Sequence, residues 1–209
     1  MPSDEDDPLA DAILSESTFE RLRATRFSPW RWPIPQKVAY QSYLLASLAA
    51  VVPLTLALPP EVAETYLGAS RLDASPHVLV LGVFSLIVLV LTGIGHAVIE
   101  LYRLRLEPDI PRDRALELLA WEDVVSSLGL GTAGVGVIGT LAGVAVGYAG
   151  TDLFESVHVS GAALLGPGGV ISVFWFGFLA LAAASTLYWL SGYLHMSNIE
   201  REAARRATV

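Results

Sequence analysis

At 209 residues the chain is long enough for one domain, and 53% of its residues are hydrophobic while only 16% are charged. Its mean hydropathy of +0.53 indicates more apolar surface than a soluble core of this size can bury, so we expect an integral membrane protein. The net charge of −8 argues against a nucleic-acid partner, because no basic patch is available to neutralise phosphates. The lack of cysteine excludes disulfides, thiolate metal sites and cysteine nucleophiles.

Residues 1–37 are expected to form a cytoplasmic N-terminal segment that is partly disordered, because its first residues are acidic and few of them are apolar. Ser17 and Glu20 have the spacing of a capping box, which predicts a short helix that runs to Arg26. The three prolines after Arg26 disfavour a regular helix, and the two tryptophans among them are typical of a bilayer surface.

Four apolar runs follow, and each has close to the ~20 residues that cross ~30 Å of hydrocarbon. We expect membrane spans at about 38–58, 78–102, 124–149 and 170–195. They predict an all-α integral membrane protein, with a four-helix bundle over residues 38–195 and a cytoplasmic tail over 196–209. Pro53 is expected to bend the first span.

The basic residues predict the orientation of the spans. All but one of the 13 Lys and Arg residues lie in residues 1–37, in residues 103–123 or in the C-terminal tail, and the exception is Arg71. An even number of spans places both termini on one side of the bilayer, and the positive-inside rule makes that side the cytoplasm. We therefore expect a multi-pass protein of the cell membrane with both termini cytoplasmic.

Residues 107–123 predict a short amphipathic helix in the cytoplasmic interface before the third span. Leu116, Leu119 and Ala120 would face the membrane, while the charged side chains would face water. Glu122, at the end of this helix, would then lie at the positive end of the dipole of the third span.

The third apolar run carries glycines at intervals that place them on one helical stripe. These are Gly129, Gly136, Gly139, Gly143, Gly147 and Gly150. Because glycine costs about 1 kcal/mol inside an ordinary helix, we interpret the stripe as a packing face that lets another helix approach closely. It would pack inside the bundle or against another protomer, with Val137 and Val144 on the opposite side.

His96, Glu100 and His195 form a predicted polar cluster within the membrane. Both histidines would lie on the order of 10 Å inside the charged cytoplasmic boundary, each beside small residues of its helix. Three interpretations remain open: a proton or ion path, axial ligation of a b-type haem by His96 and His195, or a structural role in which His96 hydrogen-bonds a neighbouring helix and the other two reach the headgroups.

No catalytic motif supports an enzyme. The chain lacks a nucleophile elbow, a P-loop and an H-E-x-x-H zinc motif, and the G-x-G-x-x-G pattern that begins at Gly134 lies inside a predicted span. We expect no metal and no cofactor, and a non-enzymatic subunit of a membrane assembly that includes further copies or other membrane subunits. A channel or transport component is one form that such a subunit can take. The alternative is a haem-carrying or redox membrane anchor that uses His96 and His195.

Overall fold

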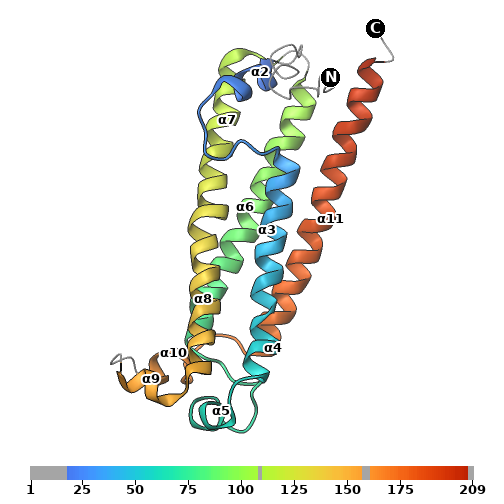
Figure 1. The fold of residues 1–209 in the computed structure, drawn as a ribbon. Coiled ribbons are helices and arrows are strands. Elements are labelled where there is room, and N and C mark those ends of the chain that lie inside the picture. The colour runs from blue at the N-terminus through green and yellow to red at the C-terminus, as the bar shows by residue number, and fades with distance from the viewer. Residues whose placement is uncertain (1–17, 108–109, 157–160, 207–209) are drawn as a thin grey trace, which may run out of the picture.

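The computed structural model describes residues 18–107, 110–156 and 161–206, which form helices and their connections (Figure 1). Within these residues there is no β-strand, only an isolated bridge between Pro76 and Pro167, and four helical rods are long and apolar enough to cross a membrane. The rods are α3 (Ile34–Ala49) with α4 (Val51–Leu56), α6 (Val78–Leu106), α7 (Arg112–Ser126) with η1 (Ser127–Ala133), α8 (Gly134–Val146) and η2 (Gly147–Ala149), and α11 (Val173–Arg206). The expected all-α architecture with four long apolar helices is confirmed.

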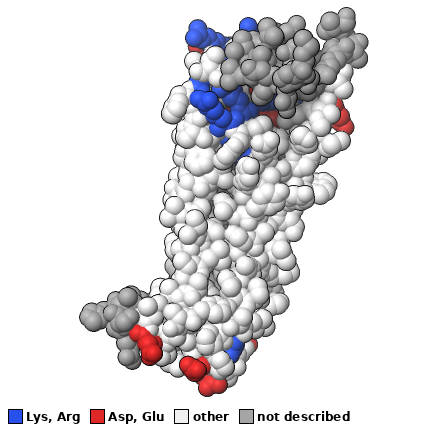
Figure 2. Space-filling model, in the orientation of Figure 1, with Lys and Arg blue, Asp and Glu red and all other residues white. Residues whose placement is uncertain are grey.

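Short helices cover the two ends of the bundle. They are α2 (Thr18–Thr25), α5 (Pro60–Tyr66), α9 (Thr151–Ser156) and α10 (Gly161–Leu164). α2 lies at the same end as the start of α7 and the last turns of α11, whereas α5, α9 and α10 lie at the other end (Figure 1). Lys and Arg gather at the α2 end, and the face between the two ends is free of charged side chains (Figure 2).

α3 and α6 form the centre of the bundle. α11 packs mainly against α3 and also touches α6, while α8 packs against α6 and, less extensively, α3. Large buried side chains from these helices, among them Leu45, Leu79, Leu89 and Phe176, fill the space between them. The core is therefore continuous from one end of the bundle to the other.

The first rod begins at Ile34, earlier than the expected start at residue 38. Pro33 is its N-cap and the next proline lies in the first turn, where the missing N–H has no helical partner in any case. Near Pro53, where a bend was expected, the helix is interrupted at Ala50, between α3 and α4. Pro53 has no N–H for the carbonyl four residues earlier, which disrupts the preceding turn.

The expectation of a separate interfacial helix before the third span was wrong. α7 continues through the π-helical η1 into α8, since neither proline nor a left-handed glycine interrupts this stretch. α7 packs against α2 and α6. Its buried residues include Ala115, Leu118 and Leu119, whereas Leu116 is 41% exposed and Ala120 is also exposed. α7 is therefore an extension of the third rod at the α2 end of the bundle.

The glycine stripe faces other helices of the same chain. A Cβ atom at Gly143 would lie 2.5 Å from Cγ2 of Val78, and one at Gly139 would lie 2.9 Å from Cδ2 of Leu81, both on α6. Gly136 approaches α6 in the same way. Of the two packing modes expected for the stripe, the structure has the one inside the bundle.

Gly129 and Gly147 extend this contact toward the two ends. A Cβ atom at Gly129 would collide with Gln41 of α3 and Thr92 of α6, and one at Gly147 would lie 2.7 Å from Cδ2 of Leu58. These distances are too short for any real Cβ atom, so the helices approach each other closely because glycine is present.

The packed face differs from the predicted stripe in two respects. Gly150 makes no packing contact, because a Cβ atom there would meet nothing within 4 Å; its φ of 82° instead favours glycine where the rod ends. Val137 and Val144, expected on the opposite side, are each 1% exposed. The buried face of α8 is thus wider than a glycine ribbon and includes the neighbouring valines.

We predict that Gly129→Ala destabilises the fold. The added methyl group would lie 2.5 Å from Oγ1 and 3.0 Å from Cβ of Thr92, and overpacking of this kind costs about 1–3 kcal/mol. Thermal unfolding of the purified protein in detergent measures the change. The matched control is Gly192→Ala on α11, where nothing lies within 4 Å and alanine should stabilise the helix by up to about 1 kcal/mol. Equal stability of the two variants would contradict the close approach at Gly129.

Candidate functional site

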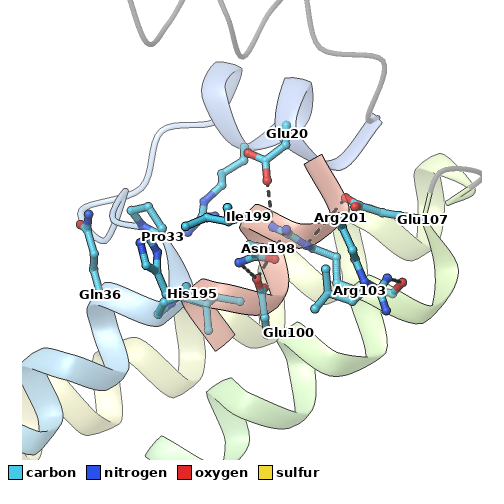
Figure 3. Close-up of a pocket in the computed structure, with 14 residues that line it drawn as sticks. Glu20, Pro33, Gln36, Glu100, Arg103, Glu107, His195, Asn198, Ile199 and Arg201 are labelled. Atoms are coloured by element: carbon cyan, nitrogen blue, oxygen red, sulfur yellow. Dashed lines mark hydrogen bonds and ion pairs between the residues drawn. The ribbon is translucent and has the colours of Figure 1, made fainter. Parts of the chain in front are cut away.

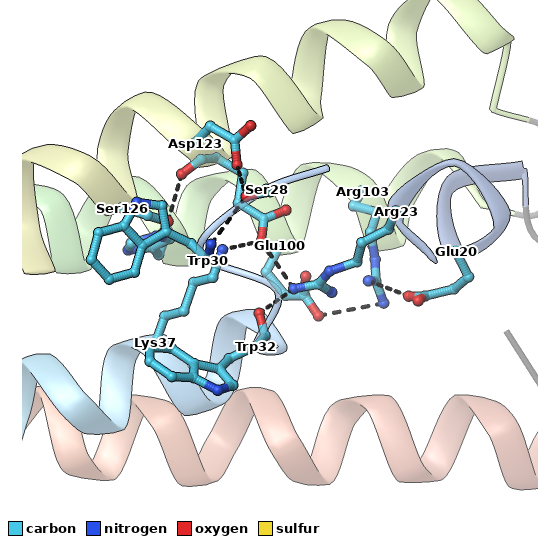
Figure 4. Close-up of polar contacts among 12 residues, drawn as sticks. Glu20, Arg23, Ser28, Trp30, Trp32, Lys37, Glu100, Arg103, Asp123 and Ser126 are labelled. Carbon is cyan, nitrogen blue, oxygen red and sulfur yellow. Dashed lines mark hydrogen bonds and ion pairs between the residues drawn. The ribbon is translucent and has the colours of Figure 1, made fainter. Parts of the chain in front are cut away.

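Ionisable side chains are buried at the end of the bundle that carries α2 (Figure 4). Lys37 is 0% exposed, Glu100 is 1% exposed and Glu122 is 2% exposed, and His96 and Arg103 are buried with them. They come from α3, α6 and α7, which lie side by side there. A buried charge is costly unless it is paired and hydrogen-bonded, so the contacts of these groups define the candidate site.

The carboxylate of Glu122 joins three segments of the chain. Its Oε1 accepts hydrogen bonds from Nζ of Lys37 at 2.5 Å and from Nη2 of Arg23 at 2.9 Å. The adjacent Asp123 accepts a hydrogen bond from Oγ of Ser28 at 2.7 Å. These contacts fix the segment between α2 and α3 to the middle of the third rod.

His96 lies directly beside this ion pair in the bundle. Its Nε2 is 3.0 Å from Oγ of Ser126, and that hydroxyl donates its single proton to the carbonyl of Glu122 at 2.6 Å. Ser126 thus connects the ring of His96 to the backbone of α7. The ring of His96 thus makes a hydrogen bond to a neighbouring helix, as the structural interpretation expects.

Polar side chains continue along the inner face of α6 beyond His96. One turn deeper, Nε2 of Gln41 donates to Oγ1 of Thr92 at 2.9 Å. Ser85 and Thr140 are also 0% exposed, and their hydroxyl groups bond to carbonyls of their own helices. Beyond Ser85 the buried side chains are mostly apolar, and the buried hydroxyls there belong to Thr140 and Thr55.

Glu100 belongs to a second group of charges at the ends of α6 and α11. Its Oε1 accepts a hydrogen bond from Nδ2 of Asn198 at 2.8 Å and lies 3.4 Å from Nη2 of Arg103. Arg103 also donates to Glu20 on α2 at 2.8 Å, and its Nε lies 3.7 Å from the carboxylate of Glu107. One guanidinium group therefore contacts three carboxylates.

This second group surrounds a cavity of about 380 Å³ between α2, the start of α3 and the ends of α6 and α11 (Figure 3). Apolar parts of its wall come from Ile34, Leu104 and Ile199. Glu100 and Asn198 lie on its floor, and the exposed side chain of His195 faces it from α11. The volume is within the range of about 300–1,000 Å³ that is typical of small-molecule sites.

The structure separates the three residues of the predicted polar cluster. Glu100 and His195 line the same cavity, while His96 does not line it and bonds to α7 instead. A haem with both histidines as axial ligands needs them on one cavity, and nothing in the described part of the chain favours that alternative. The described residues also contain no group of three His, Asp or Glu side chains that could hold a metal ion.

Sequence reasoning missed several residues of the site. Glu122 was assigned to a helix dipole, but it lies inside a continuous rod and pairs with Lys37 and Arg23. Lys37 was used only to predict the orientation of the spans, and Asn198 was assigned to the C-terminal tail. One signal was available: Lys37 is the only lysine of the chain and stands at the start of an apolar run, where a carboxylate partner is needed if it is buried.

In comparisons with family models, with curated proteins and with solved structures, nothing matches the chain. The candidate site is therefore interpreted from its own contacts.

We predict that Glu122→Leu destabilises the protein by about 3–5 kcal/mol, because it leaves the fully buried Lys37 without a carboxylate. Lys37→Met should cost less, since Arg23 still bonds to Glu122. The double variant Lys37→Met, Glu122→Leu should cost less than the sum of the single variants, because it also removes Lys37, the fully buried charge that Glu122→Leu alone leaves unpaired.

Unfolding in detergent measures all three variants. Glu117→Gln is the control: it removes a surface ion pair with Arg114 whose side chains are 52% and 60% exposed, and such pairs contribute about 0–1 kcal/mol. If Lys37→Met proves more damaging than Glu122→Leu, Glu122 is not the centre of the network.

Proposed function

We propose that the chain is a multi-pass protein of the cell membrane with both termini in the cytoplasm, and that it acts without catalysis as a subunit of a larger membrane assembly. The observation that carries the proposal is the distribution of side chains. Large hydrophobic residues cover the outside of four membrane-length rods, and charges gather at the two ends.

The outward faces of the rods support membrane insertion. Leu91 and Val98 on α6 and Val135 and Ile138 on α8 are 59–71% exposed. Apolar side chains exposed in water would cost roughly 25 cal/mol per Å², and in the hydrocarbon of a bilayer this cost disappears.

Two features support a cytoplasmic position of the α2 end. Nearly all basic residues of the chain belong to segments at this end, as the positive-inside rule requires of the cytoplasmic side. Aromatic side chains lie along α3 and α11 nearby: the ring of Tyr40 is 5.0 Å from that of Trp32 and 6.4 Å from that of Tyr43, which in turn is 6.3 Å from Tyr188. Such amphipathic rings are typical of the level of the headgroups.

The outward face of α11 supports a role in an assembly. Among the four rods, α11 buries the smallest share of its most apolar window inside the fold. Trp189 on this face is 77% exposed, and Gly192, one turn away, has open space around it. The glycine stripe of α8 already packs within the chain, so a neighbouring subunit would have to contact an outward face. α11 offers such a face, with the small Gly192 near the large Trp189.

The packed interior favours assembly over a pore inside one chain. Leu79, Val137, Val144 and Phe176 are 0–1% exposed and fill the bundle beyond the polar line on α6. A permeation route would therefore have to lie between chains. This packing supports a structural or accessory role for the chain within an assembly.

The proposed topology predicts the pattern of single-cysteine labelling. Each introduced cysteine is the only one that can react, because the natural chain has no cysteine. In intact cells, a membrane-impermeant maleimide should label Glu64→Cys on α5 but label Arg112→Cys on α7 only after permeabilisation. Both positions are exposed in the structure. Ile138→Cys, which is 67% exposed, should resist labelling in both conditions because lipid covers it.

Two outcomes of this experiment count against the proposal. Labelling of Arg112→Cys in intact cells would reverse the orientation. Rapid labelling of Ile138→Cys would show that water reaches the apolar face, which is incompatible with membrane insertion.

We predict that the chain migrates as a complex when membranes are extracted in mild detergent, and that Trp189→Ala shifts it toward the mass of a single 22.3 kDa chain. Light scattering after size-exclusion chromatography measures the mass. Val135→Ala, at a residue 71% exposed on α8, is the control and should leave the complex intact. A wild-type chain that is monomeric and carries no other protein would remove the assembly proposal.

A further inference from the structure

Arg31, on the loop between α2 and α3, is a cation without an ion pair in the described part of the chain. The residue is exposed, and its guanidinium carbon lies 5.9 Å from the ring centre of Phe27. Two carboxylates line a small cleft with Arg31, but both already have partners. Asp123 pairs with Arg26 at 3.0 Å, and Glu122 pairs with two other cations. Arg31 therefore remains available to an anion from outside.

Several contacts hold this loop in place. The side chains of Ser28 and Trp30 donate hydrogen bonds to side chains of the third rod, at 2.7 Å and 3.1 Å (Figure 4). The backbone carbonyl of Trp32 accepts a hydrogen bond from Arg23 of α2. Because the backbone on both sides of Arg31 is fixed, a ligand that binds there does not have to order the loop first.

An exposed aromatic ladder continues from this loop along α3 to α11. We use this name for the rings of Trp32, Tyr40, Tyr43 and Tyr188, which are 43–60% exposed and whose successive centres lie 5.0, 6.4 and 6.3 Å apart. α3, which carries two of the rings, lies between α11 and the third rod (Figure 1). The indole N–H of Trp32 and the hydroxyl groups of Tyr40 and Tyr43 have no hydrogen-bond partner among the described residues. The ladder thus combines apolar rings with available donors.

The order of these groups matches the order of groups in a phospholipid. A guanidinium group binds phosphate through two parallel N–H bonds, and Trp and Tyr donors are typical of the interface just below the phosphates. The apolar surface of the rods would then contact the acyl chains.

The charges beside the ladder favour an anionic lipid over a zwitterionic one. Neither α3 nor the part of α11 from Val173 to Ile199 contains an Asp or a Glu. A negative headgroup therefore meets no carboxylate of these two helices. The ammonium group of a zwitterionic lipid, in turn, would find no counter-charge on them.

We infer that Arg31 and the aromatic ladder bind one anionic phospholipid of the surrounding bilayer, with its phosphate at Arg31 and an acyl chain along the rings of α3. The inference rests on the proposed membrane insertion, which places the ladder beside lipid. It does not depend on the proposed assembly role, and it adds a lipid partner to the proposed function.

The experiment compares phosphatidylglycerol with phosphatidylcholine. The full-length protein is reconstituted in nanodiscs that contain equal amounts of the two lipids with identical acyl chains, and the lipids that stay bound after release are counted by native mass spectrometry. We expect one phosphatidylglycerol to be retained at least about fivefold more often than phosphatidylcholine, since one basic residue has an effect of this size on binding to an anionic surface.

Variants locate the site. Arg31→Gln should abolish most of the preference, and Tyr43→Ala, at a side chain that is 56% exposed, should lower the retention of phosphatidylglycerol at least threefold. Arg105→Gln is the matched control, because it removes another exposed guanidinium group at the same end of the bundle, on α6, and it should leave both quantities unchanged.

Equal retention of the two lipids by the wild-type chain overturns the inference, as does a preference that survives Arg31→Gln or retention that Tyr43→Ala leaves unchanged. A preference that appears only after the four acidic residues 4–7 are replaced by amides also overturns it, because Arg31 would then serve the N-terminal segment. None of these results alters the predicted cysteine labelling. Failure of the lipid site and failure of membrane insertion are thus distinguishable.

Discussion

The burial of one carboxylate organises the α2 end of this protein. Glu122 is 2% exposed, and its carboxylate is paired there with Lys37 of α3 and Arg23 of α2. Each cation thereby fixes the segment that carries it. The position of α2, which closes one side of the cavity and supplies Glu20 to Arg103, follows from this arrangement.

A different force holds the rest of the bundle. From Gly139 to Gly147 the third rod meets α6 and the segment around Leu58 through apolar side chains, and the glycines allow the close approach. In the proposed membrane position the hydrophobic effect adds nothing between helices, so dispersion over a closely fitted surface has to hold them. The protein thus combines strong, specific ionic contacts at one end with many weak contacts along its length.

Sequence patterns predicted what depends on local composition, and missed what depends on partners. The four spans, the interruption at Pro53 and the helix before Arg26 were found, because hydropathy and proline act within a few residues. The continuity of α7 into the third rod was missed, since an amphipathic stretch looks the same whether its apolar side meets lipid or α6. The separation of His96 from Glu100 was missed as well. Both lie on the inner side of α6, one turn apart, but His96 contacts α7 while Glu100 contacts α11.

The interruption of the first rod has a mechanical consequence. At Ala50 the hydrogen-bond ladder between α3 and α4 is broken, and Gly177 of α11 lies against Val52 just beyond the break. A helix bends most easily where its ladder is open, and at this end no buried ion pair between described residues opposes the movement. Buried ion pairs hold the α2 end, so a bend of the first rod would centre on Ala50, toward the opposite end of the bundle.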